Sequence, residues 1–501
     1  MKIQQFLEHH GVALNPFADE DAQTDPVFKE HCIASTYHPT WDKIYGDPNE
    51  PATSIVFGEK GAGKTAMRLQ IARNLDAFNR ENFGKRVYVI EYDDFNPFLD
   101  RFRDKLSQRR QRPDKALAEW KLWDHMDAIL SLGVTSLVDR VLEVSQPHGP
   151  QGCDVSPAEV ARLDRNQARD LLLLTACYDQ TSAETTKGRW HRLRKKLGFH
   201  TWKAQWDLGL GIGVSIAVAA LSLHLGINDG KWEWLTTPWP YLLAVAGWAP
   251  RLWRTWRWFW QARKIVKHVR VGNLVMNPLR QELMNFSSPE IMGQPLPNKD
   301  RTDDRYELLI KLQGILRTLG YSGIIVLIDR VDEPHLINGS AELMKAMIWP
   351  ILDNKFLKQP GIGFKLLLPI ELSRFIDREA TEFYQRARLD KQNMIPSLEW
   401  TGEALYDVAS ARLLACATPN KKPALRSLFS DAISDRRLID AFRALRVPRH
   451  LFKFLYRLLV SHCNAYTDAN PEWQISGELF ESTFALYSRD QDAFDRGLKA
   501  V

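Results

Sequence analysis

The sequence predicts an α/β fold: a parallel sheet with helices on both faces, a helical insertion that holds a long uncharged two-helix hairpin, and a helical C-terminal domain. Residues 54–57 and 324–328 form two continuous apolar runs, as buried parallel strands do. A glycine-rich loop follows the first run, and a cluster of acids follows the second. Between them, residues 208–228 contain no Asp, Glu, Lys or Arg. Beyond residue 400 the apolar positions recur with helical spacing.

Length and composition limit the class of protein. A chain of 501 residues exceeds one compact core, so we expect two or three packed units. With 45% hydrophobic and 26% charged residues, it is globular and not disordered. The 5 cysteines are far apart and form no CxxC pair, which excludes a disulfide scaffold and a thiolate zinc site. We expect no signal peptide, because no apolar run opens the chain.

The first predicted strand leads into a loop of the pattern GxxxxGK[ST]. Glycines let backbone N–H groups close around phosphate oxygens at a helix N-terminus, which favours anions. Lys64 is expected to reach the β- and γ-phosphates of a nucleotide, and the Thr65 hydroxyl to bind Mg²⁺. The strand before the loop and the helix after it are the context that this motif requires. The predicted nucleotide-binding residues are Gly58, Glu59, Lys60, Gly61, Ala62, Gly63, Lys64, Thr65 and Ala66.

The second apolar run ends in three acids. Residues 324–328 have the continuous apolar character of a central strand that is buried on both faces. Asp329 follows and is expected to hold Mg²⁺, while Glu333 or Asp332 orients and deprotonates the attacking water. The alternative is that these acids only cap a loop. The intact glycine-rich loop upstream favours the catalytic interpretation.

Two more strands are expected, at residues 85–92 and 364–370. Glu371 stands at the end of the second, where related ATPases place a polar sensor of the γ-phosphate. The arginines that follow are candidate fingers for the nucleotide of a neighbouring subunit, so a homo-oligomer is expected. The alternative is that they are solvated surface charges. They are Arg374, Arg378, Arg386 and Arg388.

The uncharged hairpin has the length and flanks of a membrane segment. At 1.5 Å per residue, residues 208–228 span about 31 Å, close to the roughly 30 Å of a hydrocarbon core. A second run, residues 234–250, is at the lower limit of length and contains three prolines. Residues 187–207 and 251–270 flank the hairpin with seven Lys or Arg each, whereas the rest of the chain is net acidic. By the positive-inside rule, both chain ends face the cytoplasm.

Aromatic and small residues support this interpretation. Ten of the 17 tryptophans fall between Trp202 and Trp260, near the ends of the two runs, as in an interfacial belt. Gly209 and Gly213 form a small-xxx-small pair that we expect to let the helices approach closely. We therefore predict the inner (cytoplasmic) membrane as the location and membrane lipid as a partner. A buried core hairpin in a soluble domain, and a hairpin that dips into one leaflet, stay as alternatives.

The order of these motifs resembles that of the KAP family of P-loop NTPases, which carry transmembrane segments inside the NTPase domain. The tail IDRVDE is similar to the acidic pattern of the wider STAND class, although Arg330 follows Asp329 where KAP members usually have a second acid. The stretch ALRVPRHLFKFLYRLL is similar to the Pro-Arg element in the helical domain of KAP and AAA+ ATPases. This resemblance implies that Arg449 is a second sensor of the γ-phosphate. The alternative is a surface arginine on a basic amphipathic helix.

The motifs divide the chain into five segments. They are an N-terminal lead (residues 1–44), the first part of the P-loop NTPase domain (45–110), a helical insertion with the membrane hairpin at about 208–250 (111–320), the second part of the NTPase domain (321–400) and a helical C-terminal domain (401–501).

Together these observations predict a membrane-anchored nucleoside triphosphatase, a hydrolase that uses ATP and Mg²⁺. ATP is favoured over GTP because no NKxD-type motif follows the strands. The resemblance implies that nucleotide state controls oligomerisation or the hairpin, in signalling or antiviral defence. One alternative is a DNA-handling AAA+ ATPase, which the acidic balance outside the flanks disfavours, so nucleic acid is the less expected partner. Another is a nucleotide-binding membrane scaffold with little hydrolysis.

Overall fold

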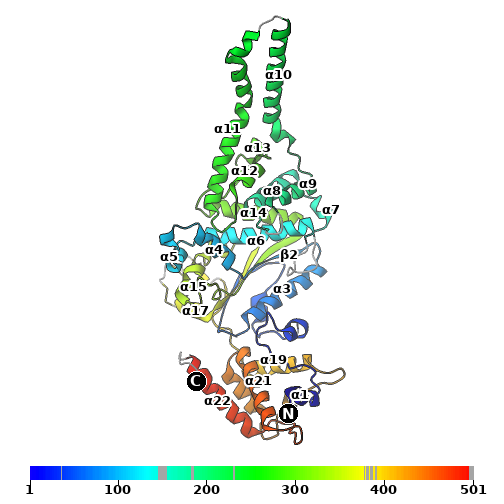
Figure 1. Cartoon of the computed structure of the whole chain (residues 1–501). Coiled ribbons are helices and arrows are strands. Elements are labelled where there is room, and N and C mark those ends of the chain that lie inside the picture. Colours follow the sequence, from blue (N-terminus) through cyan, green and yellow to red (C-terminus); the bar gives the residue numbers. More distant parts are fainter. Residues whose placement is uncertain are drawn as a thin grey trace.

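A five-stranded parallel sheet forms the middle of the computed structural model of this protein (Figure 1). The structure describes residues 1–34, 36–144, 155–181, 185–228, 232–376, 378–379, 383, 387–389 and 392–495. In spatial order the strands are β2 (Arg86–Tyr92), β3 (Tyr321–Ile328), β4 (Ile362–Pro369), β1 (Ser54–Gly58) and β5 (Asn393–Ile395). The predicted α/β class with a parallel sheet is therefore confirmed.

Helices cover both faces of the sheet. Alternate residues of β3 point to opposite sides: Val326 packs with α6 and α14, whereas Leu327 packs with α3. The continuous apolar runs are thus strands that are buried on both faces. The helices around the sheet are α2 (Trp41–Tyr45), α3 (Lys64–Glu81), α4 (Asn96–Asp104), α5 (Pro113–Ala118), α6 (Leu122–Leu142), α7 (Pro157–Val160), α8 (Arg165–Tyr178), α9 (Thr186–Lys196), α12 (Met276–Leu283), α13 (Ser288–Ile291), α14 (Asp303–Thr318), α15 (Ala341–Ile348), α16 (Asn354–Leu357) and α17 (Ile370–Ile376).

The strand β4 lies between the two motif strands, β1 and β3. It contains Lys365, a residue that is 1% exposed. The Lys365 ammonium donates to the carbonyls of Ile44 (2.7 Å) and Tyr45 (3.0 Å), so β4 is tied to α2 in the N-terminal segment. Burial lowers the pKa of Lys365 to about 8. Because β3, β4 and β1 are adjacent and parallel, the side chains at their carboxyl ends meet at one edge of the sheet.

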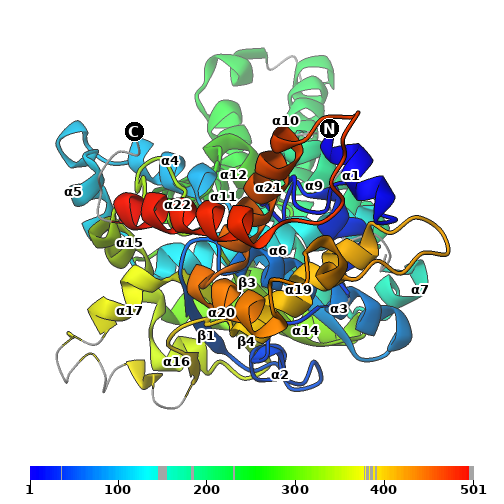
Figure 2. The ribbon, with the colours of Figure 1, turned by 90° about the horizontal axis from the view of Figure 1, so that it is seen from below.

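The N-terminal segment joins the C-terminal helical domain in one core. Phe6 and Leu7 of α1 (Ile3–His9) are fully buried in the same cluster as Leu405, Phe442 and Phe480. Figure 2 shows α1 and the C-terminal helices lying across the lower end of the sheet. The domain consists of α19 (Gly402–Ala415), α20 (Asp435–Leu445), α21 (Pro448–Ala465) and α22 (Gly477–Asp495).

Two helices project from the opposite end of the molecule as an arm (Figure 1). They are α10 (Trp206–Asn228) and α11 (Trp239–His268); the short 3₁₀ helices η3 (Trp202–Gln205) and η4 (Trp232–Thr236) precede them. The second predicted run is not α-helical from residue 234, because its first residues belong to the 3₁₀ helix η4. The helix α11 begins only after Pro238 and then continues through Pro250. Its residues before Arg251 span about 18 Å, too short to cross a hydrocarbon core of about 30 Å alone.

The contact between the two helices differs from the prediction. Gly209 and Gly213 face open space, whereas a Cβ on Gly211 would lie 2.8 Å from the Trp248 ring. A Cβ on Gly247 would lie 2.6 Å from Cβ of Val214. The predicted pair was wrong because residues four apart share one face of a helix, and that face of α10 points away from α11.

A buried ion pair joins the two arm helices at their base. Asp207, which is 1% exposed, accepts from Arg254 of α11 over 3.2 Å. Arg254 also donates to the carbonyls of Ala204, Met284 and Phe286, which links both arm helices to the segment after α12. These carbonyl contacts hold the base of the arm against the body, while Asp207 Oδ2 and Arg254 Nε have no hydrogen-bond partner among the described residues.

Candidate functional site

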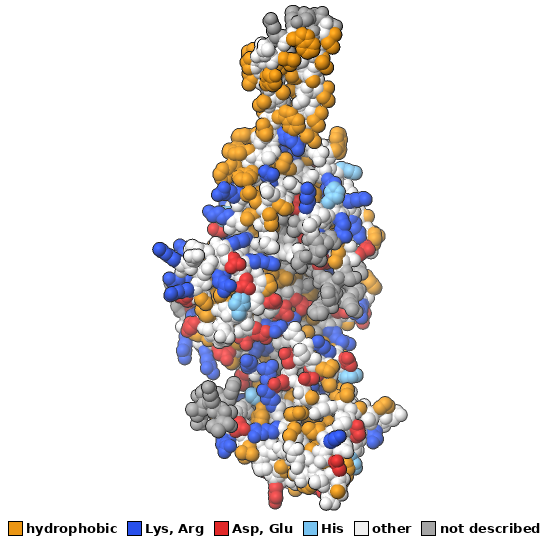
Figure 3. All heavy atoms as spheres, in the orientation of Figure 1, with side chains coloured by type: hydrophobic (Ala, Val, Ile, Leu, Met, Phe, Trp, Pro, Cys, Tyr) orange, Lys and Arg blue, Asp and Glu red, His pale blue; other side chains and the backbone are white. Residues whose placement is uncertain are grey.

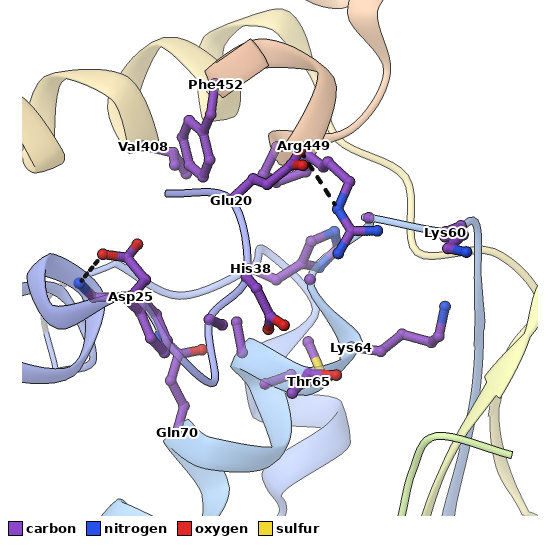
Figure 4. Close-up of a pocket in the computed structure, with 18 of the residues that line it drawn as sticks. Glu20, Asp25, His38, Lys60, Lys64, Thr65, Gln70, Val408, Arg449 and Phe452 are labelled. Atoms are coloured by element: carbon purple, nitrogen blue, oxygen red, sulfur yellow. Dashed lines mark hydrogen bonds and ion pairs between the residues drawn. The ribbon is translucent and has the colours of Figure 1, made fainter. Parts of the chain in front are cut away.

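The loop between β1 and α3 borders a cavity of about 230 Å³ at the carboxyl edge of the sheet (Figure 4). The other walls come from the end of β3, the N-terminal segment and the C-terminal domain. Gly58, Glu59 and Ala62 belong to the loop but do not line the cavity. The predicted residues that line it are Lys60, Gly61, Gly63, Lys64, Thr65, Ala66, Asp329, Asp332, Glu333 and Arg449.

Two glycines give the loop its curvature. Gly61 and Gly63 have φ angles of +88° and +93°, in the left-handed region that favours glycine. A Cβ on Gly61 would also lie 2.5 Å from Cβ of Arg449, so a larger residue does not fit. Because α3 begins at Lys64, directly after Gly63, the free N–H groups of its first turn lie beside the loop. These donors make the loop suited to a phosphate group.

The ammonium group of Lys64 lies against the loop itself. Its Nζ donates to the carbonyls of Gly58 (2.9 Å) and Glu59 (3.0 Å). Burial lowers the pKa of Lys64, and the nearby carboxylates of Asp329, Asp332 and Glu371 act in the opposite direction. Lys64 is therefore a half-buried cation near acids from the ends of two strands.

The hydroxyl of Thr65 and the carboxylate of Asp329 meet across the two motifs. Thr65 Oγ1 donates to Asp329 Oδ2 over 2.9 Å, although 264 residues separate them in the chain. Asp329 is 1% exposed, and burial raises its pKa, whereas Arg68, the Thr65 hydroxyl and Lys64 act to lower it. The sequence prediction that both residues belong to one site agrees with this geometry.

Arg68 is a functional candidate that the sequence analysis missed. It lies one turn after Thr65 on α3 and is 2% exposed. Its guanidinium contacts Glu91 (2.6 Å), Asp93 (3.0 Å) and Asp329 (3.5 Å). Arg68 lies three residues after Thr65 and therefore on the same face of α3. It was missed because no sequence motif marks its partners Glu91 and Asp93 at the end of β2.

The two candidate bases have different surroundings. Glu333 is half-exposed and forms an ion pair with Arg330, whose φ of +60° is unusual for a residue other than glycine. The hydrogen bond that Arg330 donates to the Glu333 carboxylate raises the pKa of Arg330. Asp332 instead lies close enough to Lys64 to raise the pKa of that lysine, an influence that Glu333 does not have. Of the two acids, Asp332 is therefore the one directed at the loop.

Arg449 reaches the loop from the C-terminal domain. It lies at the start of α21; its backbone N–H donates to the Gly61 carbonyl over 3.4 Å, and its Nε lies 3.9 Å from Glu20 Oε2. Figure 4 shows its side chain directed over the cavity toward Lys60. Arg449 also acts to lower the pKa of Lys64, so their charges are near each other. Arg449 thus lies beside the loop at the start of the amphipathic helix α21, with 29% of its side chain exposed.

The far wall of the cavity was not predicted from the sequence. The Trp400 indole N–H donates to the Ala62 carbonyl over 2.9 Å, and its ring packs edge-on against His38. Burial lowers the pKa of His38, which keeps the imidazole neutral. Asp25 and Arg412 form a buried ion pair (2.6 Å) that joins the N-terminal segment to α19.

The remaining candidates lie at the rim. Glu371 is exposed at the end of β4, yet its charge acts on Lys64. Arg374 and Arg378 are exposed, and Arg388 is half-buried. Arg386 lies outside the described residues. No described residue of this group contacts the loop, as expected if their target is a neighbouring subunit.

The oxygen atoms at the cavity suit a magnesium ion that is shared with a nucleotide. Mg²⁺ prefers hydroxyl and carboxylate oxygens and keeps several waters, so it needs few protein ligands. Thr65 Oγ1 and Asp329 Oδ2 provide two such atoms. Within the described residues no three His, Cys, Asp or Glu side chains gather into a metal site, so an ion without phosphate ligands does not fit. When ionised, Asp329, Glu91 and Asp93 carry three negative charges, which Arg68 and one divalent cation together would balance.

Comparisons with protein-family models, with curated proteins and with solved structures find no match to this chain.

Proposed function

We propose that this protein is a membrane-anchored nucleoside triphosphatase that binds ATP with Mg²⁺. The observation that carries the proposal is the Thr65–Asp329 contact, which joins a glycine-rich loop to an acidic strand end at one cavity. The KAP and STAND resemblance points to the same activity. A role in signalling or antiviral defence rests on that resemblance alone.

The loop residues bind and orient the phosphates. In the proposed complex, the N–H groups around Gly61, Gly63 and the first turn of α3 donate to phosphate oxygens. Lys64 gives up its two loop carbonyls for the β- and γ-phosphates, which are better acceptors because they are charged. Arg449 adds a second positive charge from α21. His38 and Trp400 offer an aromatic surface for the base.

The acids hold and deprotonate the attacking water. Mg²⁺, when bound by Thr65 and Asp329, supplies charge neutralisation at the phosphates. Asp332 is the acid that we propose as the base, because it faces Lys64 and has no hydrogen-bonding partner among the described residues. Glu333 takes this role only if its ion pair with Arg330 opens. Arg68 contacts the same oxygen of Asp329 as Thr65 does and holds the carboxylate in place.

The arm is the proposed membrane anchor. Among the described residues one helix, α10, is long and apolar enough to cross a membrane: its stretch Trp206–Leu225 has a mean hydropathy of 2.0, and 6% of it is buried. That exposure contradicts the alternative of a buried core hairpin. Figure 3 shows hydrophobic side chains over the visible face of the arm and Lys and Arg side chains below it. This distribution favours insertion of the arm with the sheet domain in the cytoplasm.

A second candidate function is a membrane scaffold that binds ATP but hydrolyses little. The ion pair between Arg330 and Glu333 favours it, because it neutralises one of the two acids beside the loop. In that case, binding of ATP would control the assembly of several copies of this chain. We propose a homo-oligomer, with Arg374 or Arg378 as the residue that reaches the neighbouring nucleotide.

Two measurements on the full-length protein test the proposal. After membrane fractionation, the protein should be in the pellet, stay there in high salt and need detergent for release. The purified protein should then bind ATP in a calorimetric titration, more tightly with Mg²⁺, and release phosphate. Binding without phosphate release would favour the scaffold. Full solubility without detergent, or affinity for DNA in place of ATP, would favour the DNA-handling alternative.

A further inference from the structure

A second cavity, of about 590 Å³, borders the base of the arm. It lies between α9, η3 and α12, and one of its walls is Gln205, the residue directly before α10. The segment after α12 supplies the carbonyls of Met284 and Phe286 to Arg254, which anchors the arm. If the arm enters a bilayer as proposed, this cavity is next to the lipid headgroups.

The inner end of the cavity is a buried acid without a donor. Glu282 on α12 is 4% exposed, and its Oε1 accepts no hydrogen bond from the described residues. Burial and the neighbouring Asp179 raise the pKa of Glu282 to about 8. Asp179 is itself held by Arg189 over 2.7 Å, so that guanidinium is already engaged. A buried carboxyl group in this state calls for a positively charged N–H donor.

The outer end of the same cavity is basic. Lys187, His191 and Arg194 on α9 line it, and Lys187 and His191 are exposed. Burial and Asp179 both raise the pKa of Glu282, so no basic group of α9 compensates for its burial. The cavity is therefore lined by a buried carboxyl group of α12 and by basic groups of α9, and the amides of Gln205 and Asn285 also line it.

We propose that this cavity binds the headgroup of a lipid that carries a primary ammonium group beside its phosphate, as phosphatidylethanolamine does. The ammonium donates to Glu282, the phosphate lies against Lys187, His191 and Arg194, and the acyl chains extend along the arm. This inference rests on the proposed membrane attachment and names the lipid class that the arm selects. The nucleotide cavity takes no part in it.

The chemistry of Glu282 distinguishes this ligand from its rivals. A quaternary ammonium group, as in phosphatidylcholine, has no N–H to donate and leaves the buried oxygen unsatisfied. A free divalent cation needs more oxygen ligands, and no three suitable acidic, His or Cys side chains meet within the described part of the chain. An anionic lipid without an amino group, such as phosphatidylglycerol, would match the basic residues of α9 but would face Glu282 without a cation.

The test compares two zwitterionic lipids on the full-length protein in detergent. Short-chain phosphatidylethanolamine and short-chain phosphatidylcholine, which differ only by methyl groups on nitrogen, are titrated by calorimetry. We expect the ethanolamine lipid to bind about tenfold more tightly, because hydrogen bonds to a charged group are among the strongest. Glu282→Gln should bring the two affinities within about twofold of each other. Glu307→Gln, which removes an exposed acid on α14, should keep the full preference.

Three outcomes would overturn the inference. Equal affinity of the two lipids for the unaltered protein would show that no ammonium site exists. A preference that persists in Glu282→Gln would place the site elsewhere, provided that thermal unfolding shows both variants to be folded. Equal binding of soluble glycerophosphoethanolamine would show that a free phosphodiester, not a lipid, is the ligand. Because ATP binding and membrane fractionation do not depend on headgroup preference, failure here leaves the proposed function to its own tests.

Discussion

The nucleotide cavity and the arm are opposite kinds of surface. In the cavity most charged groups have partners within the chain: Thr65 donates to Asp329, and Arg68 holds Glu91. In the arm many apolar side chains are exposed to solvent: Ile216 and Ile227 are 64% and 72% exposed. The difference indicates which kind of partner would complete the contacts of each region. The cavity needs a small ligand to replace internal contacts, whereas the arm needs a surrounding apolar medium.

Removal of the arm should have the largest effect. We expect replacement of residues 208–250 by a short Gly/Ser linker to move the protein from the membrane pellet to the soluble fraction, because the exposed apolar surface is lost. ATP affinity, measured by calorimetry, should persist because β1 and β3 lie outside the deleted part. Loss of both properties together would show that the two regions are not independent. A protein that stays in the pellet would move the anchor elsewhere.

Replacement of the two candidate bases should separate their roles. We expect Asp332→Asn to slow phosphate release by about 100-fold or more while ATP still binds, because an amide holds water but does not accept its proton. Glu333→Gln should have a smaller effect, since its carboxylate is engaged by Arg330. Glu59→Gln, an exposed acid of the loop, is the control. If Glu333→Gln is the slower enzyme, then Glu333 is the base and the ion pair opens during turnover.

The loop lysine should control affinity. We expect Lys64→Ala to weaken ATP binding by at least about tenfold, because it removes a charged donor from the phosphate site. Lys60→Ala is the matched control, since Lys60 lines the same cavity but is exposed. Calorimetric titration measures both. Unchanged affinity in Lys64→Ala would refute the phosphate-binding assignment of the loop.

The smallest effect should come from the contact inside the arm. We expect Gly247→Leu to destabilise the protein by about 1–3 kcal/mol, because the new side chain overlaps Val214. Gly213→Leu should be neutral, since a Cβ there meets nothing within 4 Å. Thermal unfolding in detergent compares the two. Equal destabilisation would show that α10 turns its other face to α11 in the presence of lipid or detergent.

The sequence was informative where backbone geometry alone sets the structure. Gly61, Gly63 and Lys64 follow a fixed local pattern, so the loop was predicted in detail. Arg68 and Trp400 were missed because their importance depends on which distant residues face them. The membrane prediction remains a prediction, since composition indicates what surrounds a helix but does not test it.

A second error in the sequence prediction concerned which face of the helix α10 contacts α11. Gly209 and Gly213 were selected by spacing, yet spacing does not reveal which face of a helix meets its neighbour. The resemblance located Arg449 correctly beside the loop, but it did not indicate Glu20 as its partner. Likewise, no pattern in residues 1–44 showed that this segment packs with the C-terminal domain.

The strand order also governs how the protein is made. Each strand that precedes the arm pairs only with strands that follow it: β2 with β3, and β1 with β4 and β5. The contact between Arg86 and Leu319 spans 233 residues. At a synthesis rate of 5–20 residues per second, β2 therefore waits about 10–50 s on the ribosome before its neighbour exists. During that interval the arm leaves the ribosome before β3 does, so an arm that enters a membrane as proposed can insert before the sheet is complete. A chaperone that shields β1 and β2 meanwhile would raise the yield of folded protein.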